Sequence, residues 1–159
     1  MSGRILLLSI RPKYADKIFG GIKEVELRRT RPRLCEGDLV IVYASSPKKA
    51  LIGTFEVERI IQKPLNELWR EVQGKASISY EDFCCYYEGL SVGCGIFLDN
   101  THYFNKPIEL ERLRREWDNF RPPQSYRYLK PSEINLVENI ANFDMSKFSR
   151  FYQTTLAVT

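Results

Sequence analysis

The side chains best suited to chemistry lie close together near the N-terminus, at Lys23, Glu26 and Arg28. From residue 25 the apolar and charged residues alternate, which predicts a strand with Val25 and Leu27 on one face and with Glu26 and Arg28 on the other. Residues two apart on one strand face lie roughly 6.5 to 7 Å from each other. With Lys23 at the entry turn, this set would hold an anionic backbone while Glu26 accepts hydrogen bonds from a base amino group.

The sequence leaves other interpretations of this stretch open. Glu26 and Arg28 would contribute only about 0 to 1 kcal/mol if they formed an exposed ion pair at the rim of a sheet. A Lys23 side chain removed from water beside Arg28 would instead have a lowered pKa and would act as a general base, with Glu26 orienting a water. Lys23 and Glu26 are therefore also the predicted catalytic residues if the chain is an enzyme.

Basic side chains are concentrated in two parts of the chain. The formal charge is mild, at +4 from 24 Lys and Arg against 20 Asp and Glu, and does not by itself indicate a nucleic-acid partner. Clustered cations are usually solvated surface, but on a ligand surface they neutralise phosphates and give an affinity that depends on salt. The two groups are Arg28, Arg29, Arg31, Arg33, Lys48 and Lys49, and then Arg112, Arg114, Arg115, Arg121 and Arg127.

Aromatic and polar residues complete the predicted ligand surface. Tyr43, Tyr126 and Tyr128 would stack on unpaired bases, as would the guanidinium plane of Arg127. The same tyrosines also suit the core of a barrel, and the polar loop at residues 45–47 would frame a cleft. The sequence thus predicts ligand contacts at Lys23, Glu26, Arg28, Arg29, Arg31, Arg33, Tyr43, Ser45, Ser46, Lys48 and Arg127.

The sequence lacks the signature motifs of most classes of enzyme and of cofactor site. There is no G-x-S-x-G elbow, Walker loop or C-x-x-C pair. Cys94 and His102 would lie about 26 Å apart on one straight strand, too far for a nucleophile and its base. With four cysteines and one histidine, we predict no metal, no cofactor and a reducing, cytoplasmic location. No apolar run approaches the roughly 20 residues of a membrane helix, so we predict no membrane partner.

Hydrophobic periodicity predicts an α+β domain. Several strands interrupted by single helices favour a mixed sheet that curls towards a barrel over a doubly wound sheet. The apolar strand at 38–44 is expected to be buried on both faces. We expect strands at 4–10, from 25 onwards, and at 38–44, 50–61 and 93–104, and helices at 12–20, 64–74, 79–89, 109–117 and 131–141.

The spacing Gly21-x-Lys23-x-x-Glu26-x-Arg28 resembles the G-x-K-x-x-E-x-R hallmark of the ASCH family, a branch of the PUA-like β-barrels. Residues 9–12, 37–47, 87–89 and 122–129 also resemble stretches of family members. The resemblance implies a PUA-like mixed, mostly antiparallel β-barrel of about five to six strands with peripheral helices. It assigns residues 1–141 to the domain and leaves 142–159 as an aromatic C-terminal extension that packs on the domain or on a partner.

The resemblance also implies a function. ASCH members are proposed to bind RNA in transcription coactivation or translation-linked processes, so the implied partner is RNA or a single nucleotide, held in a cleft between the barrel and the first helix. Some members are ribonucleases, and one branch removes the acetyl group of N4-acetylcytidine with a lysine, a threonine three residues later and a glutamate. Lys23 matches that lysine and Glu71 is a candidate for the glutamate, but Glu26 replaces the threonine and offers no alcohol nucleophile. A protein-interaction module and a homodimer stay open as alternatives.

Overall fold

The computed structural model describes residues 4–142 and Asp144, and it contains a curved sheet in the strand order β2-β5-β4-β3-β1-β6. β1 and β3 run parallel, whereas the other neighbouring strands run antiparallel. The predicted α+β fold with a mixed, mostly antiparallel sheet is therefore confirmed. The strands are β1 (Ile5–Ile10), β2 (Val25–Arg28), β3 (Leu39–Ala44), β4 (Ala50–Pro64), β5 (Val92–Glu109) and β6 (Tyr126–Tyr128), and the helices are α1 (Pro12–Phe19), α2 (Leu65–Val72), α3 (Tyr80–Tyr86), α4 (Leu110–Glu116) and α5 (Pro131–Ala141).

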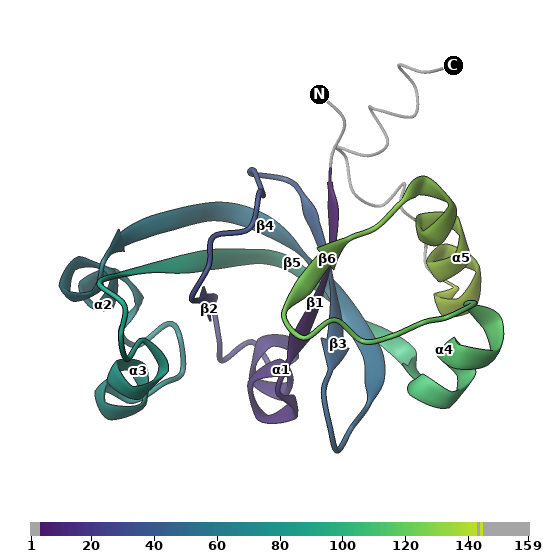
Figure 1. Cartoon of the computed structure of the whole chain (residues 1–159), viewed down its shortest axis with the longest axis horizontal. Helices are drawn as coiled ribbons and strands as arrows, with labels where there is room; N and C mark the ends of the chain where they lie inside the picture. Colours follow the sequence, from purple (N-terminus) through teal and green to yellow (C-terminus); the bar gives the residue numbers. More distant parts are fainter. Residues whose placement is uncertain (1–3, 143, 145–159) are drawn as a thin grey trace.

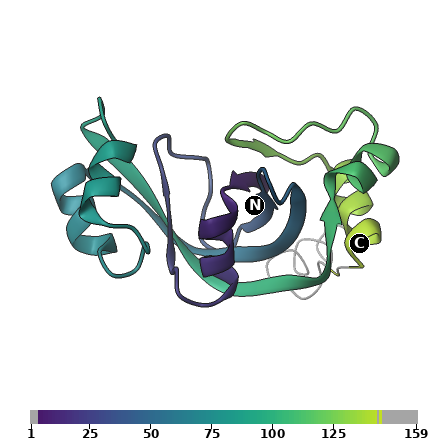
Figure 2. The ribbon, with the colours of Figure 1, turned by 90° about the horizontal axis from the view of Figure 1, so that it is seen from below.

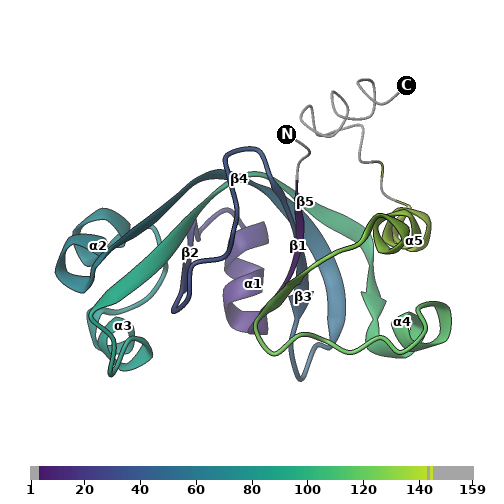
Figure 3. The same cartoon turned by 45° about the horizontal axis from the view of Figure 1, so that its top comes forward.

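The two longest strands give the sheet its curvature. β4 and β5 pair from Ala50 with Glu109 to Pro64 with Val92, and their register shifts at three places along the way. Such bulges bend a strand and increase its local twist. Figures 1 and 3 show the result, a sheet curled into a half-barrel. Both strands run past their predicted ends at residues 61 and 104, because each continues to supply hydrogen-bond partners to the other.

The short strand β6 lies in a proline-bounded segment for which the sequence predicts no regular structure. Its residues 126–128 pair antiparallel with residues 6–8 of β1. Only this tertiary pairing makes the segment a strand, since three residues carry too little periodicity to indicate one. The pairing brings the chain from 122 to 125 beside the end of β1.

Helices cover the sheet at both ends and in the middle, as Figure 2 shows. α2 and α3 form one end, where Leu68 packs with Val25 of β2. α1 packs Ile18 against the central strands, and α4 and α5 form the other end through Leu113 and Val137. β3 is buried along its whole length, which confirms the prediction for that strand.

Close approach between α1 and the sheet depends on Gly53. A Cβ atom there would lie 2.4 Å from the carbonyl oxygen of His102 and 2.7 Å from the ring of Phe19. Neither the backbone nor the packed ring leaves room for that atom, so a glycine is required. Its small size lets α1 lie against β4 and form one wall of the site described below.

None of the helices in residues 4–142 is both long and apolar enough to span a bilayer. The predicted C-terminal extension, 142–159, lies outside the described residues apart from Asn142 and Asp144.

Candidate functional site

A pocket of about 730 Å³ lies between α1, β2, α3 and the loop that precedes β6. Its volume is in the range of about 300 to 1,000 Å³ that is usual for ligand sites. Lys23, Glu26, Arg28 and Ser45, all predicted from the sequence, line it together. The pocket therefore collects the central charged pattern in one place, next to the first helix.

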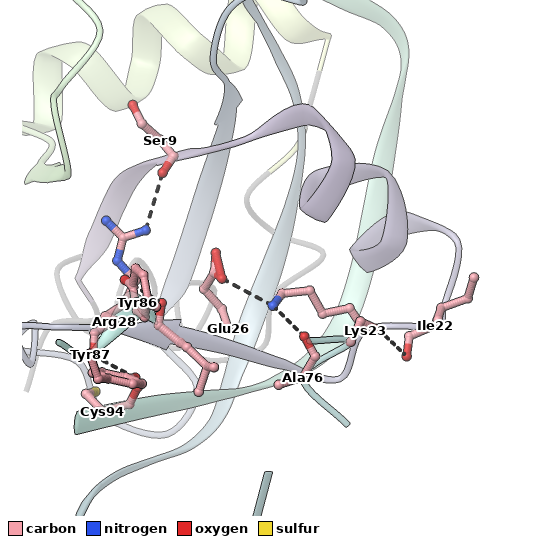
Figure 4. A network of polar contacts seen from close by, with 11 residues as sticks. Ser9, Ile22, Lys23, Glu26, Arg28, Ala76, Tyr86, Tyr87 and Cys94 are labelled. Carbon is pink, nitrogen blue, oxygen red and sulfur yellow. Dashed lines mark hydrogen bonds and ion pairs between the residues drawn. The ribbon is translucent and has the colours of Figure 1, made fainter. Parts of the chain in front are cut away.

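The turn after α1 positions Lys23. Gly21 adopts a left-handed φ of +78°, which ends the helix, and the amides of Ile22 and Lys23 both donate to the carbonyl oxygen of Lys17 at 2.9 Å. These bonds fold the chain back so that Lys23 lies ahead of β2. Its side chain then points towards Glu26 and the carbonyl oxygen of Ala76 (Figure 4).

The ammonium of Lys23 is surrounded by three groups. Its Nζ lies 3.4 Å from Oε1 of Glu26, donates a 3.0 Å hydrogen bond to the carbonyl oxygen of Ala76, and lies 5.0 Å from the centre of the Tyr14 ring. Lys23 is 4% exposed and Glu26 is 5% exposed. The Lys23–Glu26 pair is thus buried at the base of the pocket rather than solvated at its rim.

Burial lowers the pKa of Lys23 below the usual value for lysine. Glu26 acts in the opposite direction through its charge and its hydrogen bond, while the charges of Lys17 and Arg28 lower the pKa further. The net direction is downward. Lys23 therefore loses its proton more readily than a lysine in water, although Glu26 opposes that loss.

Arg28 ties the pocket wall together. One of its terminal nitrogens donates to the carbonyl oxygen of Ser9 at 3.3 Å and the other donates to Oγ of Ser125 at 2.6 Å. Ser9 in turn donates from its hydroxyl to the carbonyl oxygen of Pro123 at 2.6 Å. In the described structure Glu26 pairs with Lys23 and not with Arg28. The exposed Glu26–Arg28 pair that the sequence left open is therefore not formed.

Two neighbouring tyrosines hold β2 in place. The hydroxyl of Tyr86 donates to the carbonyl oxygen of Leu27 at 3.1 Å. The hydroxyl of Tyr87 lies 3.1 Å from the carbonyl oxygens of both Arg28 and Cys94, so its single proton is shared between them. Burial raises the pKa of both tyrosines, which keeps them protonated as donors.

Replacing Tyr87 by phenylalanine is expected to lower the free energy of unfolding by about 1 to 3 kcal/mol, because the buried carbonyl group of Cys94 and the partly buried one of Arg28 lose the donor that they share. Urea denaturation of wild type and variant measures this difference. Tyr80→Phe is the matched control, since Tyr80 is exposed and its loss should change stability by less than about 0.5 kcal/mol. Equal stability of the Tyr87 variant and the wild type would contradict the role given to this hydroxyl.

The other predicted ligand residues lie outside the pocket. Tyr43 is 2% exposed and packs in the core with its ring 6.3 Å from that of Phe120. Arg127 donates to both carboxylate oxygens of Glu133, at 3.2 and 3.0 Å, and lies over the ring of Trp117. The remaining predicted ligand residues are exposed on loops, and these are Arg29, Arg31, Arg33, Ser46 and Lys48.

Several pocket residues were not predicted from the sequence. Arg11 and Lys13 are exposed cations at the start of α1, and Tyr14 contributes the ring beside Lys23. Asp82 and Cys85 line the pocket from α3. Tyr14 fits the apolar face of α1, so the periodicity assigned it to the core. The basic residues on either side of Pro12 were the signal that could have indicated a rim.

Cys94 and His102 lie eight residues apart along β5, where Cys94 pairs with Gln62 of β4 and His102 pairs with Thr54. Burial raises the pKa of Cys94 to about 11, which keeps its thiol protonated. Glu71, the candidate for the amidohydrolase glutamate, is paired with Lys63 and does not line the pocket. Within residues 4–142, no cluster of three or more Cys, His, Asp and Glu has a metal-binding arrangement.

A half-barrel sheet with a pocket beside its first helix is the architecture expected for an ASCH domain. The chain belongs to the ASCH domain family. The family model for the ASCH domain matches residues 8–129.

Individual relatives agree with that assignment. A protein of Zymomonas mobilis named ASCH domain-containing ribonuclease is 34% identical over 136 residues, which cover 86% of this chain and 91% of the relative. The crystal structure of ASCH from Zymomonas mobilis aligns with a TM-score of 0.80 and 30% identity, over 86% of this chain and 94% of that one. Human THYN1, solved with 5-methylcytosine-containing DNA, shares the fold at a TM-score of 0.58 and 12% identity, over 89% of this chain and 99% of that one.

Proposed function

We propose that this protein binds RNA, with one nucleotide held in the pocket over the Lys23–Glu26 pair. The observation that carries the proposal is the burial of this pair at the base of a cavity with further cations on its walls. The relative from Zymomonas mobilis that is named a ribonuclease supports RNA as the ligand.

The energetics of a buried ion pair favour a ligand site. Two charges taken out of water lose solvation that their mutual attraction offsets only in part, so an apolar pair of similar size often stabilises a fold at least as well. A bound nucleotide would use both charges, because Glu26 accepts from a base amino group and Lys23 neutralises an oxyanion. Arg11 and Lys13 would bind the phosphates on either side.

A binding measurement with rim variants tests this proposal. Replacing Arg11 and Lys13 by glutamine should weaken binding of single-stranded RNA about tenfold and reduce its salt dependence by about 0.7 for each phosphate that is no longer neutralised. Both side chains are exposed, so the fold should tolerate the change. Fluorescence anisotropy with labelled RNA at several salt concentrations gives the affinity and the slope.

The matched control removes the same charge elsewhere. Arg70 and Lys75 are exposed and do not line the pocket, so the double variant Arg70→Gln with Lys75→Gln should bind like the wild type. The proposal fails if the wild type shows no salt-sensitive binding, or if the rim variant and the control variant bind equally well.

A second candidate function is cleavage of the bound RNA. It is favoured by the lowered pKa of Lys23 together with the relative named a ribonuclease. A neutral Lys23 amine would take the proton from a 2′-hydroxyl, the 2′-oxygen would attack the adjacent phosphorus, and the 5′-oxygen would leave with a proton from water. The products would carry a 2′,3′-cyclic phosphate and a 5′-hydroxyl. Product ends analysed after incubation with RNA test this route directly.

A further inference from the structure

A second basic groove lies on the far side of the turn between β3 and β4. It has a volume of about 630 Å³ and is lined by Lys48 and Lys49 from the turn and by Arg114 and Arg115 from α4. All four side chains are exposed, and among residues 4–142 none of them forms an ion pair. Their charges are therefore accessible to a ligand.

The turn is a wall shared by this groove and the pocket. Ser45 lines the pocket and is anchored to the end of β1, since its amide donates to the carbonyl oxygen of Ile10 at 2.9 Å. The carbonyl oxygen of Ser45 accepts from the amides of Lys48 at 3.1 Å and Lys49 at 3.3 Å, so both lysines follow within one tight turn. Figures 1 and 3 show this turn between α1 and α4.

The two walls of the groove are fixed relative to each other. The amide of Leu110, the first residue of α4, donates to the carbonyl oxygen of Lys49 at 2.9 Å. Next to this bond, Ala50 pairs with Glu109 where β4 begins and β5 ends. Leu113 is fully buried and holds α4 against the core. A groove with such walls holds the backbone of its cationic residues in place, so only their side chains lose conformational freedom on binding.

We infer that this groove is a phosphate-binding subsite that continues the pocket, so that the ligand is an RNA strand of several nucleotides running over the β3–β4 turn rather than a free nucleotide. The inference rests on the proposed function, since it extends the same bound RNA. A strand leaving the pocket at Ser45 meets Lys48 and Lys49 next and then the two arginines. Glu109 and Glu111 also line the groove, so its lining carries four cations against two carboxylates.

RNA length is the variable that separates the groove from the pocket. We would measure anisotropy with labelled RNAs of about 4 and about 12 nucleotides, which span the site sizes of common single-strand binding domains. Replacing Arg114 and Arg115 by glutamine should weaken binding of the longer RNA about tenfold and reduce its salt slope by about 0.7 for each phosphate left without a cation. Affinity for the shorter RNA should stay at the wild-type value.

A variant that is expected to strengthen binding controls for loss of structure. Glu111→Gln removes a carboxylate from the groove and should strengthen binding of the longer RNA about threefold. Damage to the fold does not produce tighter binding. Lys48→Gln, on the opposite wall, should weaken binding of the longer RNA alone.

The outcomes distinguish the groove from the pocket. If the wild type binds neither RNA in a salt-sensitive way, the proposed function fails, and the inference about the groove fails with it. If the wild type binds both RNAs but the arginine variant loses affinity for neither, or equally for both, the groove inference is overturned while the pocket stands. An equal loss of affinity in the Arg70→Gln with Lys75→Gln control would also overturn it, because the effect would then be one of net charge.

Discussion

Replacing Lys23 by glutamine is expected to lower the rate of RNA cleavage, the second function proposed for the pocket, about 100- to 10,000-fold, which is what a positioned general base contributes. Glutamine keeps a hydrogen-bond donor on a side chain one bond shorter than that of lysine, but it takes up no proton at neutral pH. Initial rates with end-labelled RNA at equal protein concentrations measure the effect. Circular dichroism of the variant tests whether the fold is retained.

The dependence of the rate on pH identifies Lys23 more specifically. A base must be neutral, so the rate should rise with pH and level off above the pKa of Lys23, which burial places below the usual value for lysine. Glu26 raises this pKa, so Glu26→Gln should move the levelling point to lower pH. Lys17 lowers it, so Lys17→Gln should move the point to higher pH.

These opposite shifts are a matched pair of controls. The two variants remove charges of opposite sign near Lys23, so a base at this position must shift in opposite directions in the two. Shifts in the same direction, or a profile that neither variant moves, would exclude Lys23 as the base. RNA binding would then remain as the better account of the pocket.

Local sequence patterns predicted the elements that surround the pocket. Alternation identified β2, the uninterrupted apolar run identified β3 as buried on both faces, and proline and glycine marked the ends of α1. Each of these features depends on residues close in sequence. The charged pattern from Lys23 to Arg28 likewise predicted that Lys23, Glu26 and Arg28 would lie near one another.

Partners that come from distant parts of the chain could not be predicted in this way. Arg28 donates to Ser125, which is 97 residues away, and Ser125 reaches that position only because β6 pairs with β1. Lys23 contacts the carbonyl oxygen of Ala76, which is 53 residues away in the sequence, and the ring of Tyr14 on α1. An alternating pattern shows which face Glu26 occupies, but it does not show whether that face is covered.

The Lys23–Glu26 pair is expected to cost the fold stability when only one partner is removed. Lys23→Met should lower the free energy of unfolding by about 3 kcal/mol, because Glu26 is left as a buried charge without its cation. Urea denaturation gives this difference, and unchanged slopes would show that both proteins unfold to comparable states. Lys13→Met, at an exposed site on the pocket rim, is the control and should change stability by less than about 0.5 kcal/mol.

Removing both partners should restore the stability that the single change removes. In the double variant Lys23→Met with Glu26→Leu no buried charge remains, so stability should return to within about 1 kcal/mol of the wild type or exceed it. RNA binding should nevertheless be abolished, because the pocket then has an apolar base. That combination would show that the pair is kept for its ligand and not for the fold. A double variant as unstable as Lys23→Met alone would mean instead that the two charges hold β2 against the turn after α1, and the argument from burial to function would fail.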